Sequence, residues 1–468
     1  MATGANWNVE LREMLMLGGS LALGQVTRVG FAVVSVIMMG WISVQALAAG
    51  ALVNSVVLLL FLSCSGVLQG ISPLLGLELE AGQYSWINRV MLHGVIVAAG
   101  LTAFSALILI GLPLLLSLNG QPESVLREAR LYVWVLIPGF FPALWLMGLR
   151  YLLASVGKVF WLNLIQIVGV MVGIGGNYLL AFGYWGFPAL GLMGIGLSTS
   201  LVNGLILVVM LLFLKWSPQW AGLAGVGWPR PVEADLLRRI LRIGGPIGVV
   251  LFVETALFAA AHAMIGYIGV EALAAHAIAM QLFYFVIIVP VGLSQAATAR
   301  VALAIGRYSK QNLLHSASAA TLIAFVFVGI IGGGMFFQAE WLVGLVLGYQ
   351  RELNPLIIER AVSFTRIAAL TQGLSGMVIV LAGIARGYQD TASAMLYVLV
   401  GYWGIGLGCA AILAFGFRME GEGIWWGMTA GFAFSLLTLI GRLFHMNKRI
   451  KAQFGDGDVV ASRAGGPG

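Results

Sequence analysis

Apolar residues run along this chain in long stretches, separated by short polar or charged breaks. Each stretch can form a helix of about 20 residues or more, the length needed to cross the hydrocarbon core of a bilayer. The apolar residues do not alternate with polar ones, which argues against a membrane β-barrel. The pattern predicts an all-α fold with twelve spans, near 13–40, 46–75, 87–116, 126–155, 159–183, 188–215, 236–267, 271–300, 315–348, 356–386, 391–416 and 423–446.

The composition agrees with a polytopic membrane protein. Of the 468 residues, 60% are hydrophobic and 9% are charged, whereas soluble domains carry about 25% charged residues. A soluble core could not hide that much apolar surface, so we expect a lipid bilayer around the helices. The N-terminal segment lacks the pattern of a cleaved signal peptide, and Cys64 and Cys409 lie inside apolar stretches, where we expect packing residues.

The net charge of +7 indicates orientation in a membrane rather than a nucleic-acid partner. If both termini are cytoplasmic, the inner segments contain most of the Lys and Arg residues. The outer segments then contain only Arg127, Arg130, Arg351, Arg360 and Arg418. This asymmetry follows the positive-inside rule. We therefore expect a cell inner-membrane protein with both termini in the cytoplasm.

The two halves of the chain resemble one another. Four pairs of segments recur in the same order: LGGS (17–20) with IGGP (243–246), ISVQALAAGA (42–51) with IGVEALAAHA (268–277), GQYSWIN (82–88) with GRYSKQN (306–312), and LAFG (180–183) with LAFG (413–416). Several ordered matches indicate duplication. Each half then contains six spans, and transporters built from such repeats hold substrate near the midplane between the halves.

The polar breaks divide the chain into four parts. We predict an N-terminal six-helix lobe at 1–216 and a cytoplasmic linker at 217–235, which is rich in Pro, Gly and basic residues. A C-terminal six-helix lobe follows at 236–447. The Gly-rich polar tail at 448–468 is expected to be disordered.

Glu254 is the acidic residue that lies in the middle of a predicted span. A carboxylate there is costly unless it faces a cavity or a partner, so it marks a candidate functional site. It could exchange a proton or bind sodium, and a structural ion pair stays open as an alternative. We expect no cofactor other than this coupling ion, H⁺ or Na⁺, and no metal site other than sodium at Glu254.

The repeat places Arg28 at the position equivalent to Glu254, because the two are 226 residues apart, like 42–51 and 268–277. The two opposite charges can face each other across a cleft, or each can face the inside of its own half. A purely structural role for Arg28 is also open.

Other polar residues inside the spans could complete a site. They are Gln25, Asn177, Gln281, Thr371, Gln372 and Ser375. Each of them alone is better explained by a hydrogen bond between helices than by a role as a ligand. The histidines show no metal-binding spacing, and the chain has no G-x-S-x-G or P-loop motif, so hydrolase and ATPase functions are disfavoured.

Several stretches resemble the multidrug and toxic compound extrusion family, NorM-like branch. They are ALAAGAL (46–52), RIGGPIGVVLFVETALF (242–258), GVEALAAHAIA (269–279), PVGLSQAATARVALAIG (290–306) and AGIARGYQDT (382–391). The resemblance implies two six-helix lobes around a V-shaped cleft, and export of organic cations in exchange for sodium or protons. Glu254 matches the coupling carboxylate of the family. Ser375 and Ser35 stand where the family has aspartates, which leaves Glu254 alone.

The leading interpretation is a cation-coupled antiporter that exports lipophilic cationic small molecules by alternating access of two lobes. A lipid-linked sugar flippase of the same superfamily is an alternative, although only Arg28 supplies a cation inside a span of the predicted cleft. A membrane transferase would need clustered acids or histidines, which the loops lack. The expected partners are a small-molecule substrate and the bilayer. We do not expect an enzyme, and we expect the protein to be a monomer.

Overall fold

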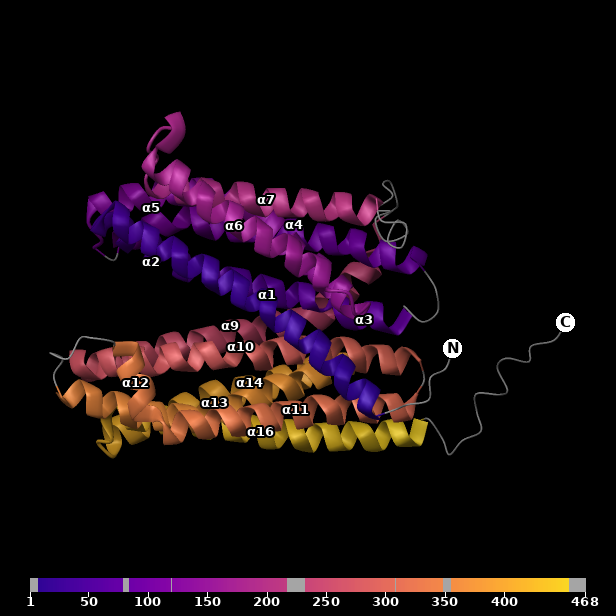
Figure 1. Cartoon of the computed structure of the whole chain (residues 1–468). Helices are drawn as coiled ribbons and strands as arrows, with labels where there is room; N and C mark the ends of the chain where they lie inside the picture. The colour runs from indigo at the N-terminus through magenta and orange to yellow at the C-terminus, as the bar shows by residue number, and fades with distance from the viewer. Residues whose placement is uncertain are drawn as a thin grey trace. The chain divides into compact units, whose positions relative to one another are not determined.

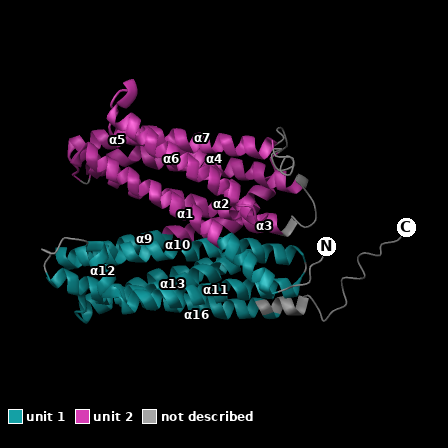
Figure 2. Ribbon diagram, viewed as in Figure 1, with its two compact units in different colours: residues 1–18, 253–468 teal, residues 19–252 magenta. Residues whose placement is uncertain are grey.

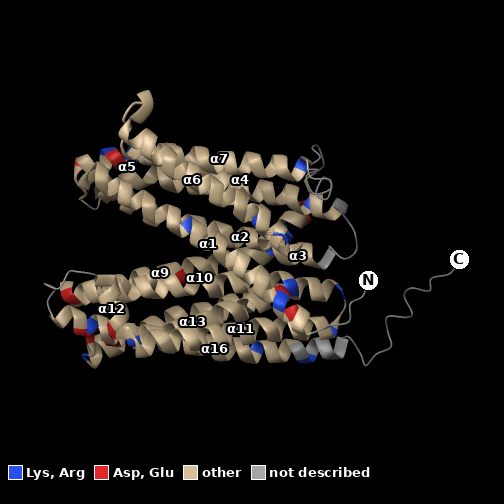
Figure 3. Ribbon diagram, in the orientation of Figure 1, with Lys and Arg blue, Asp and Glu red and all other residues tan. Residues whose placement is uncertain are grey.

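The computed structural model describes residues 7–78, 84–118, 120–216, 232–307, 309–347 and 355–453, and these ranges are almost entirely helical (Figure 1). Twelve helices among them are long and apolar enough to cross a membrane, which confirms the predicted fold class and number of spans. Helices suit lipid because each satisfies its own backbone hydrogen bonds. Charged residues gather toward the helix ends, and the helix middles contain few of them (Figure 3).

The chain divides into two compact units (Figure 2). Unit 1 contains residues 1–18 and 253–468, and unit 2 contains residues 19–252. Two helices are shared: α1 (Trp7–Ile42) begins in unit 1 and continues in unit 2, whereas α9 (Ala234–Ile268) begins in unit 2 and continues in unit 1. The predicted lobes at 1–216 and 236–447 follow chain order, so they differ from these units in the first parts of α1 and α9. Most of the predicted linker at 217–235 lies outside the described residues.

Unit 2 is organised around α5, which contacts α2, α4 and α7. Its helices after α1 are α2 (Val44–Gln69), α3 (Ile71–Glu78), α4 (Tyr84–Leu118), α5 (Glu123–Ser155), α6 (Phe160–Phe182), the short turn η2 (Tyr184–Gly186) and α7 (Leu192–Trp216). The Ser43 hydroxyl accepts a hydrogen bond from the Ala46 N–H at 3.0 Å and so caps α2. Gly183, with φ of 76°, ends α6 in the left-handed conformation that glycine adopts without strain.

Unit 1 is organised around α13, which contacts α10, α11 and α16. Its helices after α9 are α10 (Val270–Gly306), α11 (Lys310–Phe337), α12 (Ala339–Leu347), α13 (Pro355–Gly387), α14 (Thr391–Leu399), the π-helical turns η3 (Val400–Leu407) and η4 (Ile412–Gly416) on either side of α15 (Gly408–Ala411), and α16 (Glu420–Gln453). Because α5 and α13 are each the fourth spanning helix of their half, the two units share one organisation.

The structure refines three of the predicted segments. The span at 315–348 is two helices, α11 and the short α12, and the span at 391–416 contains π-helical turns. Hydropathy does not register these changes because the apolar run is unbroken. Helix α16 continues to Gln453, so the first residues of the predicted tail at 448–468 are helical, and 454–468 lie outside the described residues.

Candidate functional site

Glu254 lies in α9, inside one of the spanning helices, and its side chain is partly buried. Among the described residues, no hydrogen bond or ion pair satisfies its carboxylate. Arg386, Tyr284 and Tyr402 lie within electrostatic range of it. The Arg386 guanidinium is itself buried and donates to the Ser294 hydroxyl. Glu254 therefore has a counter-charge nearby without a direct contact.

Aromatic side chains surround this part of unit 1. We define the aromatic cluster as Phe258, Phe283, Tyr284, Tyr402, Trp403 and Phe432. The Phe258 ring, one helical turn after Glu254, lies 5.2 Å from the Phe283 ring and 5.8 Å from the Tyr284 ring. The Trp403 Nε1–H donates to the Val253 carbonyl at 3.1 Å, directly beside Glu254 along the chain. A carboxylate among aromatic rings is an arrangement that attracts organic cations.

The π-helical turn η3 brings Tyr402 and Trp403 to this position. Such turns shift the register of a helix and are frequent at functional sites. Gly401 allows the turn to approach α16, because a Cβ on it would lie 2.0 Å from the Ser435 hydroxyl oxygen. Sequence reasoning missed these two aromatics because, in an apolar stretch, they look like any lipid-facing residue.

Three further predicted residues, Thr371, Gln372 and Ser375, are fully buried in α13. The Thr371 hydroxyl lies 2.6 Å from that of Thr429, which supports an interhelical hydrogen bond. The Gln372 amide and the Ser375 hydroxyl have no partner among the described residues. Unpaired buried polar groups are uncommon in proteins, so these two are stronger site candidates than Thr371. Gln281, in contrast, is exposed on α10.

Arg28 lies in a separate place, on the wall of a cavity of about 340 Å³ inside unit 2. The cavity is lined from α1, α2, α5, α6 and α7. Ser35 lines it too, and its hydroxyl donates to the Phe31 carbonyl at 2.9 Å while accepting from Asn177 Nδ2 at 3.0 Å. Gln25 accepts a hydrogen bond from Arg28. Four of the predicted residues thus meet in and around this one cavity.

The cavity also contains polar groups that the sequence analysis did not select. The Tyr132 hydroxyl donates to Asn54 Oδ1 at 3.1 Å, and both residues line the cavity. The pairing joins α5 to α2. Nothing local to either residue points to it, because the two lie 78 positions apart in the chain.

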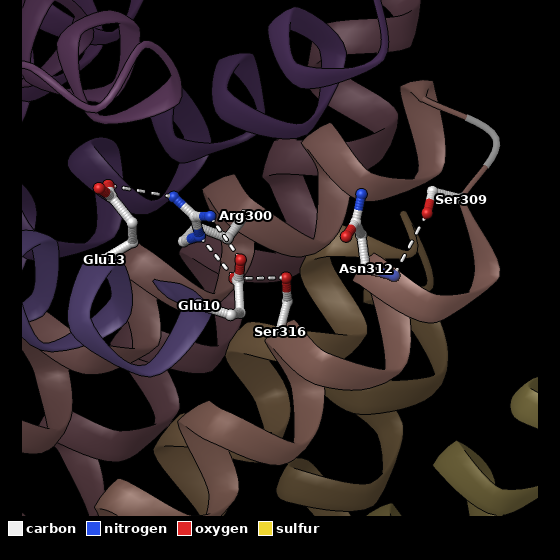
Figure 4. Close-up of polar contacts among 6 residues, drawn as sticks. All are labelled: Glu10, Glu13, Arg300, Ser309, Asn312 and Ser316. Atoms are coloured by element: carbon white, nitrogen blue, oxygen red, sulfur yellow. Dashed lines mark hydrogen bonds and ion pairs between the residues drawn. The ribbon is translucent and has the colours of Figure 1, made fainter. Parts of the chain in front are cut away.

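A third charged cluster lies where α1 begins in unit 1 (Figure 4). Glu10 accepts hydrogen bonds from Arg300 Nε at 2.6 Å and Nη2 at 2.5 Å, and from the Ser316 hydroxyl at 2.6 Å. Glu13 lies 3.5 Å from the same guanidinium. Both acids are paired, so this cluster fixes the start of α1 against α10 and α11 rather than offering a free carboxylate.

Comparisons with known proteins agree with this architecture. The MatE family profile matches residues 21–179 and 246–412. The chain is 32% identical to a Pseudomonas putida protein named "Probable multidrug resistance protein NorM", over 97% of the chain and 98% of that protein. It is 28% identical to the Synechocystis protein of the same name, over 95% and 96%.

Solved structures give the same result for the fold. The bent form of the Vibrio cholerae MATE transporter VcmN superposes with a TM-score of 0.84 at 14% identity, covering 96% of this chain and 99% of that one. A matching family profile in both halves, together with full-length relatives, shows that the protein is a transporter rather than an enzyme. The chain belongs to the MatE family of integral membrane transporters.

Proposed function

We propose that this protein is a multidrug efflux transporter that exports lipophilic, cationic small molecules by cation-coupled antiport. The names of its relatives support the drug-efflux class. The observation that carries the mechanism is Glu254, a carboxylate inside a spanning helix, beside the aromatic cluster and without a bonded partner among the described residues. A costly charge in such a place is retained for function.

One carboxylate can couple two ligands if they compete for it. An ionised Glu254 attracts an organic cation, whose apolar body can rest on the exposed ring of Tyr284, which packs against the buried Phe258. A protonated Glu254 has no charge to offer, so the cation is released. Alternating exposure of this site to the two sides of the membrane then exchanges a proton for a substrate.

The donor set favours a proton over sodium as the coupling ion. Hard cations are held by several oxygen ligands, carboxylates among them. Ser375 stands where the family resemblance implies a second carboxylate in the C-terminal half, and Ser35 stands where it implies one in the N-terminal half, so neither position supplies a carboxylate. One carboxylate with neutral oxygens makes a poor cage for sodium, whereas it suffices for a proton.

The test is efflux of a fluorescent lipophilic cation such as ethidium from proteoliposomes. Glu254→Gln keeps the size of the side chain and removes only its ability to ionise, so we expect coupled efflux to stop while the protein still inserts and purifies. Glu271→Gln, in the exposed first turn of α10, is the matched control and should behave as wild type. Normal efflux by the Glu254 variant would refute the proposal.

A further inference from the structure

The cavity in unit 2 differs in charge from the site around Glu254. Among the described residues that line it, Arg28 is the only one with a charged side chain, and none is Asp or Glu. The remaining wall is mainly apolar and aromatic, with Phe31, Phe61, Phe140 and Tyr132 among its members. Its volume of about 340 Å³ falls within the range of small-molecule sites, roughly 300–1,000 Å³.

Among the described residues, the contacts of Arg28 supply no counter-charge to its guanidinium. Its guanidinium donates to Gln25 Oε1 and to the Met147 sulfur at 3.6 Å, and it lies over the Phe61 ring at 5.3 Å. All three partners are neutral. A guanidinium has five N–H donors and thioether sulfur is a weak acceptor, so the group can still accommodate a stronger acceptor.

A buried arginine behind the cavity wall adds to the positive charge of this region. Arg150 in α5 donates to the Leu21 carbonyl and to Gln166 Oε1 at 3.4 Å, and its Nε has no partner among the described residues. Gln166 and Gly24 both line the cavity and both contact Arg150, so this arginine lies directly behind the wall. The charges of Arg150 and Arg28 repel one another.

Two guanidinium charges in a low-dielectric interior are costly without an anion. The described acidic side chains of unit 2, Glu123, Glu128, Glu233 and Asp235, lie near the starts of α5 and α9, and none of them lines the cavity. Ser35, where the family resemblance implies an aspartate, does line it and contributes no charge. An anionic ligand would supply the missing charge, and the aromatic wall would hold an apolar ring system.

We propose that the unit 2 cavity binds the carboxylate of aromatic organic anions and zwitterions, with Arg28 as the residue that recognises the charged group. Arg28 then forms a charge-assisted, two-point hydrogen bond to the carboxylate, the geometry for which a guanidinium is suited. Arg150 favours the same anion through its field. The inference rests on the proposed efflux function, and it extends the substrate range from cations to compounds that carry a carboxylate.

The test uses three fluorescent ligands that share one aromatic group: dansylglycine, an anion; dansylamide, which is neutral; and dansylcadaverine, a cation. Binding is measured by fluorescence at equilibrium in a non-ionic detergent, without any ion gradient. Wild type should bind dansylglycine about tenfold or more tighter than dansylamide, the gain expected for a hydrogen bond to a charged group. In Arg28→Gln the two affinities should become equal, with dansylamide binding unchanged.

Two further variants keep the result decisive. Arg28→Lys retains a charge, so it should keep part of the preference if Arg28→Gln does not fold. Arg366→Gln, which alters an exposed arginine paired with Glu340 in unit 1, should keep all of it. The proposal would be overturned if wild type bound the three ligands equally or bound the cation most tightly. It would also be overturned if the preference for dansylglycine survived Arg28→Gln.

The outcome is separable from that of the proposed function. Glu254→Gln should retain the preference for dansylglycine, because Glu254 lies in unit 1 and the cavity lies in unit 2. A carboxylate preference in wild-type protein that performs no coupled efflux would refute the antiport mechanism alone. Coupled efflux of ethidium without any carboxylate preference would refute the present inference alone.

Discussion

The cluster of Glu10, Arg300 and Ser316 allows a quantitative prediction about stability. The Glu10 and Arg300 side chains are 11% and 17% exposed, and three hydrogen bonds of 2.5–2.6 Å converge on the Glu10 carboxylate. Arg300→Met removes the cation but fills similar space. It leaves the Glu10 carboxylate buried near Glu13 without the guanidinium that hydrogen-bonds to it, although Arg307 remains within electrostatic range. Breaking one side of a buried pair costs about 3–5 kcal/mol, so we expect a loss of that size in the free energy of unfolding.

The measurement is a double-mutant cycle, with unfolding followed in mixed detergent micelles. Glu10→Gln in the Arg300→Met background removes the uncompensated charge, so the double variant should recover part of the loss. Arg366→Met is the matched control. Its ion pair with Glu340, at 3.0 Å, is 45% and 77% exposed on the two sides, so the expected loss is below about 1 kcal/mol. Equal losses for Arg300→Met and Arg366→Met, or strictly additive effects in the cycle, would show that the cluster does not act as a buried pair.

Three further predictions concern substitutions of single residues in unit 1. Trp403→Phe removes the hydrogen bond to the Val253 carbonyl and should reduce efflux several-fold while costing about 1 kcal/mol or less of stability; efflux equal to wild type would contradict a role for this contact. Gly427→Ala places a Cβ 2.2 Å from the Ala410 backbone nitrogen, so α15 and α16 must separate, and the melting temperature should fall clearly, whereas Gly441→Ala, with open space around it, should change little. Ser375→Asp restores a carboxylate where the family resemblance implies one, and it should add a response to sodium that wild type lacks; an unchanged ion response in flux assays would argue against sodium binding near α13.

Much of the fold could be predicted from the sequence because lipid imposes a simple rule on it. A spanning segment must satisfy its own backbone groups and expose apolar side chains, so the apolar runs alone indicate helices and their number. The short helix α12 and the π-helical turns near Tyr402 could not be predicted in this way. Both depend on backbone geometry inside an apolar run, where hydropathy does not change.

The candidate site could be predicted only in part. Glu254 and Arg28 were found because a charge inside a span is rare and costly. Their surroundings were not, because contacts such as Tyr132 with Asn54, or Trp403 with Val253, join residues that are distant in the chain. The repeat in the sequence predicts that Arg28 and Glu254 occupy equivalent positions. Only the structure shows that Arg28 lies on the wall of a cavity whose other lining side chains are neutral.

The central claim is that ionisation of Glu254 couples an ion gradient to substrate export. The most direct measurement imposes a pH step and a sodium gradient separately on proteoliposomes and follows ethidium efflux by wild type and Glu254→Gln. We predict that wild type responds to the pH step at constant sodium and that the variant responds to neither gradient. Efflux by wild type that is indifferent to both gradients, or a pH response that persists in Glu254→Gln, would contradict the account.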